Sequence, residues 1–332
     1  MNTPLIETEH QRYAQQMNLI EVGEKGQRRL KEATVLVVGA GGLGCAALHY
    51  LAAAGIGRLI IVDRDTVELN NLHRQLLYSC DDIGEQKALI AKRTLQKINP
   101  HVNVESYNLY LNTENALRFI SQAHIVVDAT DNYQSRYVIN DACASAKKPF
   151  VYGSIHHFEG HIALFEHPLD YRYVFPTPPQ QTSKCTTEGV IGALPAIIGA
   201  MQAMECLKYI LQQPGLKGQL LLFNALTWQT KRFNLANSEE TINITPSTLH
   251  AWYAQGIDIL LIDLQEVDER ERRHEKALAI PFSSLFEQLT LIPKNKILVF
   301  LCSSGTRSTY AAHYLRHYLG NKNAYALISN SH

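Results

Sequence analysis

A glycine-rich turn near the start of the chain has the spacing of a phosphate-binding loop. The stretch VVGAGGLG contains Gly39, Gly41 and Gly44 in the pattern G-x-G-x-x-G, directly after a run of β-branched residues. Glycines let the backbone approach a phosphate, and a helix that starts there offers unpaired N–H groups and a favourable dipole. Asp63 ends the next apolar run, where a carboxylate can hold ribose hydroxyls. The pattern predicts a nucleotide site and fits NAD, FAD and ATP equally.

Polar side chains further along the chain distinguish between these nucleotides. Asn71, Arg74 and Gln75 lie within DRDTVELNNLHRQLL, and Lys87 follows. Arginine and lysine neutralise the charge of a triphosphate during transfer, although surface ion pairs are an alternative role for both. Asp131, in VVDATDN, follows another apolar run, and there it can hold Mg²⁺ that bridges phosphate oxygens. Taken together, these side chains favour ATP with Mg²⁺.

Near the end of the chain, four residues separate a cysteine from an arginine. Cys302 follows an apolar run, and Arg307 begins a segment of helical character. Backbone N–H groups of the loop and the helix N-terminus can stabilise a negative charge on the sulfur. A C-x5-R loop is typical of protein tyrosine phosphatases, whereas C-x4-R has the size for a persulfide. The alternative is an inert cysteine at a glycine turn. The predicted persulfide loop is Cys302, Ser303, Ser304, Gly305, Thr306 and Arg307.

Alternating strands and helices have to position these loops. TVLVVGA (34–40) predicts a buried strand, CAALHYLAAAG (45–55) a helix and RLIIVDRD (58–65) a second strand, and the alternation continues to PFVYGSI. This order predicts an α/β fold with a doubly wound parallel sheet. Residues 158–182 are irregular and rich in proline, which favours a mobile crossover loop. GQLLLFNALTWQTKRFNL predicts a closing hairpin.

A polar stretch at 237–245 predicts a linker between two domains. Residues 1–236 hold the nucleotide motif, and residues 246–332 form a second, smaller α/β domain. In the second domain, DILLIDL (258–264) and KILVFLC (296–302) predict strands. VDERERRHEK and RSTYAAHYLRHYL predict helices.

The composition argues against several classes of protein. Among the 332 residues, lysine plus arginine and aspartate plus glutamate number 31 each, so bulk charge does not favour a nucleic-acid partner. The N-terminus lacks a signal-peptide pattern and no apolar run is long enough for a bilayer, so we expect a cytoplasmic protein without a membrane partner. Six cysteines without any C-x-x-C pair argue against a disulfide framework and a four-thiolate zinc site.

Three motifs, taken in order, resemble those of the MoeB/ThiF adenylyltransferases, which are relatives of ubiquitin-activating enzymes. The motifs are GAGGLGCAALHYLAAAGIGRLIIVD, DTVELNNLHRQ with Gln86-Lys87, and DATDN. The resemblance runs from residue 10 to residue 230 and implies a Rossmann-like adenylation domain that binds ATP and Mg²⁺. It implies adenylation of the C-terminal glycine of a small ubiquitin-like sulfur-carrier protein that ends in Gly-Gly. It also implies a homodimer, in which an N-terminal arginine reaches the partner's ATP site.

The resemblance also implies roles for individual residues. Asp63 would hold the ribose; Asn71, Arg74 and Lys87 would contact the phosphates; and Asp131 would be the Mg²⁺-linked carboxylate. Arg74, Lys87 and Asp131 would be catalytic. The implied nucleotide-binding set is Gly39, Gly41, Gly42, Gly44, Asp63, Asp65, Asn71, Arg74, Gln75, Lys87, Asp131 and Asn132.

KCTTEGVIGALP (184–195) resembles the cysteine-bearing segment of the family, with Cys185 at the end of the crossover loop. A thiol near an activated acyl group can form a thioester or resolve an acyl disulfide. The resemblance therefore implies a catalytic role for Cys185, and an inert cysteine is the alternative.

Two features depart from the family pattern. Relatives bind a structural zinc with two C-x-x-C pairs, whereas here Asp170 and Tyr173 stand where the first pair is expected and the second pair is missing. We therefore predict no zinc, with Tyr171, Tyr173 and Phe175 packing the flap instead. Gln15 replaces the second arginine of the R-Y-x-R-Q motif. Because such an arginine can stabilise transition-state charge, its replacement bears on the adenylation rate but does not exclude ATP binding.

LLIDLQEVDE, AIPFSSL and LCSSGTRS together resemble a rhodanese domain, a fusion that recurs among MoeB-type enzymes. By this resemblance Cys302 carries a persulfide sulfur that comes from a cysteine-desulfurase-type donor. His274 takes the place of the histidine that follows a glycine in relatives. The chain stops at NAYALISNSH, where relatives continue, so we expect a shortened rhodanese-like domain.

These observations predict ATP-dependent adenylation of a carrier of the ThiS/MoaD type, followed by sulfur transfer from Cys302. An NAD(P)-dependent oxidoreductase shares the glycine loop but leaves Arg74, Lys87 and the C-x4-R loop unexplained. A non-catalytic ThiF-type protein that binds a carrier or partner, and adenylation of a different carboxylate, are the further alternatives. The sequence leaves the pathway open between thiamine, molybdopterin, a thiolated metabolite and tRNA.

Overall fold

The computed structural model describes residues 4–175, 189–235, 243–265, 277–288, 292–293, 296–302, 306–318 and 321–328. The chain divides into two compact units. The described residues of the first unit are 4–171 and 189–232. Those of the second unit are 172–175 and the described ranges that follow residue 232.

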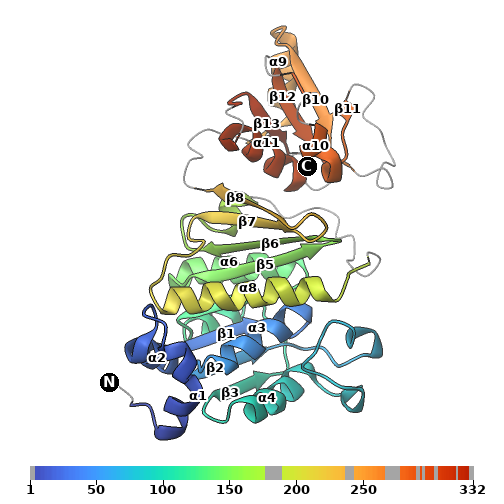
Figure 1. The fold of residues 1–332 in the computed structure, drawn as a ribbon. Coiled ribbons are helices and arrows are strands. Elements are labelled where there is room, and N and C mark those ends of the chain that lie inside the picture. The colour runs from blue at the N-terminus through green and yellow to red at the C-terminus, as the bar shows by residue number, and fades with distance from the viewer. Residues whose placement is uncertain are drawn as a thin grey trace. The chain divides into compact units, whose positions relative to one another are not determined.

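The first unit is built on an eight-stranded sheet with the order β3-β2-β1-β4-β5-β6-β7-β8 (Figure 1). Strands β1 to β5 pair in parallel, whereas β6 pairs antiparallel with β5 and with β7. The chain winds outward from β1 in both directions, as predicted for a doubly wound sheet. Ligands of such sheets bind at the carboxyl ends of the strands, where the order reverses between β1 and β4. The strands are β1 (Thr34–Val38), β2 (Arg58–Val62), β3 (Asn103–Tyr107), β4 (Ile125–Asp128), β5 (Phe150–His156), β6 (Glu159–Phe165), β7 (Gln219–Asn224) and β8 (Gln229–Asn234).

Helices pack on both faces of this sheet. Helices α3 and α8 lie on one face and α6 on the opposite face (Figure 1). Buried side chains of α4 share a core with those of α3 and α8. The helices are α1 (Glu7–Met17), α2 (Gly23–Glu32), α3 (Gly42–Ala53), α4 (Lys87–Ile98), α5 (Ala116–Ile120), α6 (Tyr133–Ala146) and α8 (Ala193–Ile210), with the 3-10 turns η1 (Leu69–Asn71) and η2 (Cys80–Asp82). The short helix α7 (Tyr171–Val174) begins at the last residue of the first unit's segment, and its other residues belong to the second unit.

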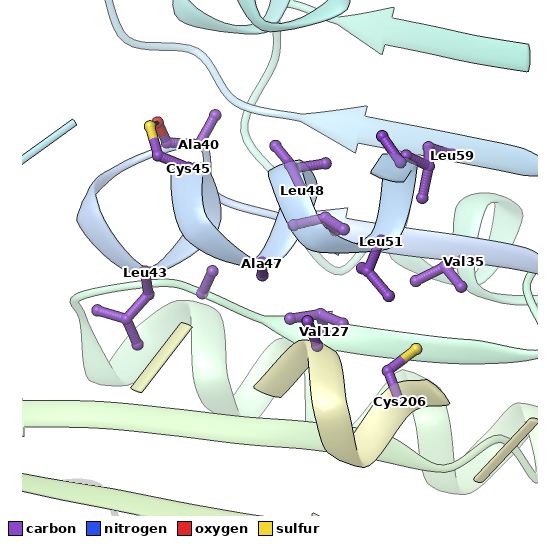
Figure 2. Close-up of a cluster of buried hydrophobic side chains, with 14 of the residues drawn as sticks. Val35, Ala40, Leu43, Cys45, Ala47, Leu48, Leu51, Leu59, Val127 and Cys206 are labelled. Atoms are coloured by element: carbon purple, nitrogen blue, oxygen red, sulfur yellow. Dashed lines mark hydrogen bonds between the residues drawn. The ribbon is translucent and has the colours of Figure 1, made fainter. Parts of the chain in front are cut away.

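The core between α3, α8 and the sheet fixes the start of α3. Leu48 and Leu51 of α3 are fully buried, and Figure 2 shows Leu51 beside Val35 of β1, with Cys206 of α8 facing the same cluster. Alanine and leucine are strong helix formers, and they fill α3. Small residues let α8 come close, because a Cβ on Gly199 would lie 2.2 Å from the carbonyl oxygen of Leu43. The N-terminus of α3 is therefore held against α8.

Strand β6 corrects the interpretation of 158–182 as an irregular segment. The β5–β6 hairpin turns at His157, whose φ is +51°, where glycine or asparagine is the usual signal of a turn. Within β6, a Cβ on Gly160 would lie 2.2 Å from Cδ1 of Ile198, so a glycine sits in the strand to admit α8. A histidine in the turn and a glycine in the strand are why the pattern was not recognised. Strands β7 and β8 form the hairpin that was predicted to close the domain.

The second unit has a five-stranded parallel sheet with the order β11-β10-β12-β13-β9. The predicted strands at 258–264 and 296–302 form the neighbours β10 and β12, and the last predicted helix is α11. The predicted helix VDERERRHEK and His274 lie outside the described residues. The elements are β9 (Asn243–Ile244), α9 (Pro246–Ala254), β10 (Ile259–Asp263), β11 (Leu278–Ala279), η5 (Phe282–Ser284), α10 (Leu285–Gln288), β12 (Ile297–Leu301), α11 (Thr306–Tyr318) and β13 (Ala324–Leu327).

Both faces of this second sheet are covered by apolar side chains. Ile262 and Phe300 pack with Leu315 of α11 on one face, whereas Leu261 packs with Leu249 of α9 on the other. This explains why β10 and β12 are almost continuously apolar rather than alternating. Among the residues that the structure describes, no helix in either unit is long and apolar enough to cross a membrane.

Candidate nucleotide site and persulfide loop

The glycine loop joins β1 to α3 and has little room for side chains. Gly39 has a φ of +95°, a conformation that favours glycine, and a Cβ there would lie 2.7 Å from the carbonyl oxygen of Ala129. A Cβ on Gly44 would lie 2.0 Å from the carbonyl oxygen of Gly39. Helix α3 begins at Gly42, after Gly41 as its N-cap. The first N–H groups of α3 therefore open onto this loop, as a phosphate site requires.

Asp63 follows β2 and lies beside the glycine loop. Its Oδ2 accepts the N–H of Ala40 at 2.6 Å, and its Oδ1 accepts the N–H of Asp65 at 2.8 Å. Burial raises the pKa of Asp63, and these two hydrogen bonds oppose that effect. Each carboxylate oxygen can accept a second hydrogen bond. The group is thus fixed in place and still able to accept ribose hydroxyls.

Lys87 is the first residue of α4, and its side chain is buried. Its Nζ lies 3.2 Å from Oδ2 of Asp65, and its N–H donates to the Asp65 carbonyl at 3.0 Å. The lysine side chain is 7% exposed, whereas that of Asp65 is 56% exposed. A buried ammonium whose carboxylate partner is exposed can exchange that partner for a phosphate oxygen.

A turn that includes η1 presents the next three predicted residues to the glycine loop. Asn71 is buried, and its side-chain amide makes two hydrogen bonds within the turn. A Cβ on Gly42 would lie 3.6 Å from Cγ of Arg74, and one on Gly41 would lie 3.8 Å from Nε2 of Gln75. The buried Oε1 of Gln75 has no hydrogen-bond partner among the described residues. This oxygen is available to a ligand donor.

Asp131 and Asn132 lie on the loop that follows β4. Strand β4 ends at Asp128, so Asp131 lies three residues beyond it and is exposed. Asn132 is the N-cap of α6, and its Oδ1 accepts the N–H of Ser135 at 2.9 Å. Because the carbonyl of Ala129 borders Gly39, this loop and the glycine loop are neighbours. The structure thus brings the glycine loop, the Arg74 turn and the Asp131 loop to one edge of the sheet.

Two buried polar residues at this edge were not predicted. The hydroxyl of Tyr78 donates to the carbonyl of Ala40 at 2.7 Å and so helps to fix the glycine loop. Asp128 is fully buried, and burial raises the pKa of its carboxyl group. A recognisable signal existed only for Asp128, because an Asp two residues before a Thr at the end of a strand commonly caps its own turn.

The predicted Mg²⁺ site consists of one carboxylate. Mg²⁺ is commonly held by one or two carboxylates plus substrate phosphates, and the exposed Asp131 beside the glycine loop fits that arrangement. Within the described ranges, no group of three or more histidine, cysteine, aspartate or glutamate side chains could hold a metal ion.

The segment where relatives would bind zinc is packed by aromatic side chains. Tyr171 is 1% exposed, and its ring contacts those of Tyr137, Tyr152 and Phe165. Asp170 is buried, with Oδ2 3.2 Å from Nδ1 of His167. Of the two other residues predicted to pack this segment, Tyr173 is half-buried and Phe175 is buried. Gln15 of α1 is exposed.

Cys302 follows β12, and its sulfur lies at the start of α11. Its Sγ accepts the N–H of Ser308 at 3.4 Å and lies 3.6 Å from Oγ of Ser308. Ser308 is in the first turn of α11, where N–H groups have no partner within the helix. Arg307 is half-buried in the same turn, which begins at Thr306. The remaining predicted residues, Cys185, Ser303, Ser304 and Gly305, lie outside the described residues.

The comparison with protein families agrees with this arrangement. The family model described as "ThiF family" matches residues 13–243, which is more than half of the chain. This protein belongs to the ThiF family. The match includes the glycine loop, the Arg74 turn, Lys87 and the Asp131 loop, and it ends at the beginning of the second unit.

Several ThiF-type relatives are similar in sequence. The sulfur carrier protein adenylyltransferase of Thermus thermophilus is 49% identical over 226 residues, which cover 65% of this chain and 83% of that protein. A probable molybdopterin-synthase adenylyltransferase of Porphyra purpurea is 35% identical and covers 93% of this chain and 88% of its own. The probable adenylyltransferase/sulfurtransferase MoeZ of Mycobacterium tuberculosis is 34% identical and covers 90% of this chain and 86% of its own.

Solved structures share the fold of the ThiF-family unit at lower identity. PaaA has a TM-score of 0.61 at 21% identity and covers 71% of this chain and 76% of its own. MccB of E. coli has a TM-score of 0.59 at 22% identity and covers 70% of this chain and 71% of its own. At this level of identity the likeness concerns the fold alone.

Proposed function

We propose that this protein uses ATP to adenylate the C-terminal glycine of a small ubiquitin-like sulfur-carrier protein, and that Cys302 then delivers sulfur to the activated glycine as a persulfide. The observation that carries the first half is the contact of the glycine loop with both the Arg74 turn and the loop that leads to Asp131. The names of the similar proteins from Thermus thermophilus and Porphyra purpurea support an adenylyltransferase.

In the proposed adenylation, a carboxylate oxygen of the carrier's terminal glycine attacks the α-phosphorus of ATP. The bond to the pyrophosphate group breaks, and the products are acyl-adenylate and pyrophosphate. The N–H groups at the start of α3 bind phosphate oxygens, and Asp63 accepts the ribose hydroxyls. Lys87 and Arg74 neutralise the charge that accumulates on the pyrophosphate. Asp131 would hold Mg²⁺, which would supply positive charge to offset that of the phosphates.

In the proposed sulfur transfer, a cysteine-desulfurase-type donor leaves a sulfane sulfur on Cys302. The terminal sulfur attacks the acyl-adenylate carbonyl and AMP departs, so the carrier becomes an acyl persulfide on Cys302. The thiolate of Cys185 then attacks the Cys302 sulfur, which releases a thiocarboxylate and leaves a Cys185–Cys302 disulfide for an external thiol to reduce. The N–H of Ser308 supports this role of Cys302 because it stabilises charge on the sulfur.

We further propose residues 1–236 as the adenylation domain, 237–245 as a linker that leads into the second sheet through β9, and 246–332 as the rhodanese-like domain, in a homodimeric enzyme. The name of the similar protein MoeZ, which is matched over 90% of this chain, supports the combination of both activities in one polypeptide.

ATP–pyrophosphate exchange tests the adenylation directly. Exchange of labelled pyrophosphate into ATP is expected only when a carrier with a free Gly-Gly terminus is present, because the reverse reaction needs the acyl-adenylate. A carrier whose last glycine is deleted is the matched control. Carrier binding without exchange would support a non-catalytic binding protein, and exchange driven by a different carboxylate would assign another substrate.

A further inference from the structure

A carboxylate that the proposed reaction does not use lies fully buried at the end of β4. Asp128 has no exposed surface. Its Oδ1 accepts both the N–H of Thr130, at 3.0 Å, and the hydroxyl of Thr130, at 2.6 Å. Its Oδ2 has no hydrogen-bond partner among the described residues. A buried carboxylate with one oxygen unmatched opposes folding, so stability does not explain why it is there.

Thr130 is held from its other side by a buried arginine. Arg136, in the first turn of α6, donates from Nη2 to the carbonyl oxygen of Thr130 at 3.3 Å. Its guanidinium lies over the rings of Tyr133 and Tyr152, with its central carbon 5.4 Å from each centroid. The N–H, the hydroxyl and the carbonyl of Thr130 are therefore all engaged, one residue before Asp131.

The same loop is anchored to the elements on either side of it. The N–H of Ala129 donates to the Val38 carbonyl at 2.9 Å, and the carbonyl of Ala129 abuts Gly39. Nε2 of the buried Gln202, on α8, donates to the Asp128 carbonyl at 2.6 Å. The backbone leading to Asp131 thus cannot shift relative to the glycine loop unless the bonds to Thr130 break.

We infer that Asp128, through Thr130, is a positioning residue that sets where the Asp131 carboxylate lies relative to the phosphates of ATP. This inference rests on the proposed adenylation. An exposed carboxylate on an unrestrained loop samples many positions, and positioning errors of about 1 Å lower rates by about 100-fold. Asp128 and Arg136 each hold Thr130 and so remove that freedom, while the Asp131 side chain stays accessible to the substrate.

Two substitutions of Thr130 separate positioning from packing. Thr130→Val removes the hydroxyl donor and keeps the shape of the side chain, whereas Thr130→Ser keeps the hydroxyl. In carrier-dependent ATP–pyrophosphate exchange, we expect Thr130→Val to lower kcat by about tenfold or more and to leave the KM for ATP within about twofold. Thr130→Ser should stay within about twofold of the native kcat. Equal rates for both variants and the native protein would overturn the inference.

A double-variant cycle with Asp131→Asn shows whether Thr130 acts through Asp131. If it does, adding Thr130→Val to Asp131→Asn lowers kcat no further, whereas independent effects multiply and would contradict the inference. Hydrogen exchange of the Thr130 and Asp131 amides gives a readout that needs no activity. We expect these two amides to exchange hydrogen faster in Thr130→Val than in Thr130→Ser. Identical hydrogen-exchange rates in the two variants would reject the positioning role. If the native protein shows no ATP–pyrophosphate exchange, the proposed adenylation itself is refuted instead.

Discussion

Lys87 illustrates how individual residues at the sheet edge are prepared for an anionic substrate. Its methylenes are buried at the start of α4, and its ammonium group has Asp65 as the one ion-pair partner found among the described residues. Burial lowers the local dielectric constant, so the attraction between this ammonium and a phosphate exceeds that of a surface pair. The exposed carboxylate of Asp65 pairs with the lysine until a phosphate replaces it.

Replacement of Lys87 by methionine should therefore impair adenylation. We expect Lys87→Met to lower kcat/KM for ATP–pyrophosphate exchange by about 100-fold or more, because the charge of the departing pyrophosphate is no longer neutralised. Lys97→Met, at the exposed end of the same helix, is the matched control and should change kcat/KM by less than about twofold. An unchanged rate in Lys87→Met would remove Lys87 from the site.

At the scale of elements, a polar network ties the edge strand β3 to the rest of the sheet. Arg58 of β2 donates to both carboxylate oxygens of Glu105, at 2.7 and 3.0 Å, and to the side chain of Gln122 at 2.9 Å. The hydroxyl of Tyr107 donates to the same carboxylate at 3.0 Å. These hydrogen bonds, with that from Arg58 first, hold the pKa of Glu105 below its ordinary value.

The stabilising effect of Glu105 should depend on pH. A lowered carboxyl pKa means that the stabilisation is present above the ordinary pKa of 4.5 and is lost as pH falls through the folded-state pKa. In urea denaturation followed by circular dichroism, Glu105→Gln should be less stable than the native protein at pH 7 by about 1 kcal/mol. The difference in unfolding free energy should shrink toward zero as pH falls below the folded-state pKa of Glu105. If the difference in stability between Glu105→Gln and the native protein does not change with pH, the effect of the substitution comes from packing.

At the scale of the whole molecule, the chain combines a widely shared unit with a second one. The relative from Thermus thermophilus covers 65% of this chain, and the family match ends at residue 243, whereas MoeZ covers 90% of it. The second unit has its own parallel sheet and its own apolar core. In the proposed function, the acyl-adenylate has to meet a sulfur nucleophile to become a thiocarboxylate, and this would give a chemical reason to join the two units.

The two proposed activities should be separable by one substitution. Cys302→Ala removes the sulfur at the start of α11, so thiocarboxylate formation on the carrier should fall to background when the persulfide donor is supplied. Exchange of pyrophosphate should stay within about twofold of native, because no residue of the ATP site changes. Mass spectrometry of the carrier measures the thiocarboxylate, and its undiminished formation in Cys302→Ala would show that sulfur enters by another route. Cys80→Ala, at an exposed cysteine of η2, controls for loss of a thiol elsewhere.

Features that depend on neighbouring residues can be predicted from the amino-acid sequence. The spacing of Gly39, Gly41 and Gly44 predicts a tight strand-to-helix turn, because glycine permits backbone conformations and close approaches that other residues do not. The apolar runs of β1, β2, β10 and β12 predict buried parallel strands because helices cover both faces of such sheets. Roles for individual residues were predicted from the resemblance of whole motifs, because composition and periodicity predict only the fold.

Features that depend on residues distant in the chain become apparent in the folded molecule. Glycine in β6 is explained by the approach of α8, and the sequence near Gly160 carries no sign of it. The hydroxyl of Tyr78 reaches the carbonyl of Ala40, and the side chain of Gln202 reaches the carbonyl of Asp128, only when segments distant in the chain come together. Burial, which changes the meaning of a carboxylate or a hydroxyl, is a property of the packed molecule and is not encoded in any short stretch of sequence.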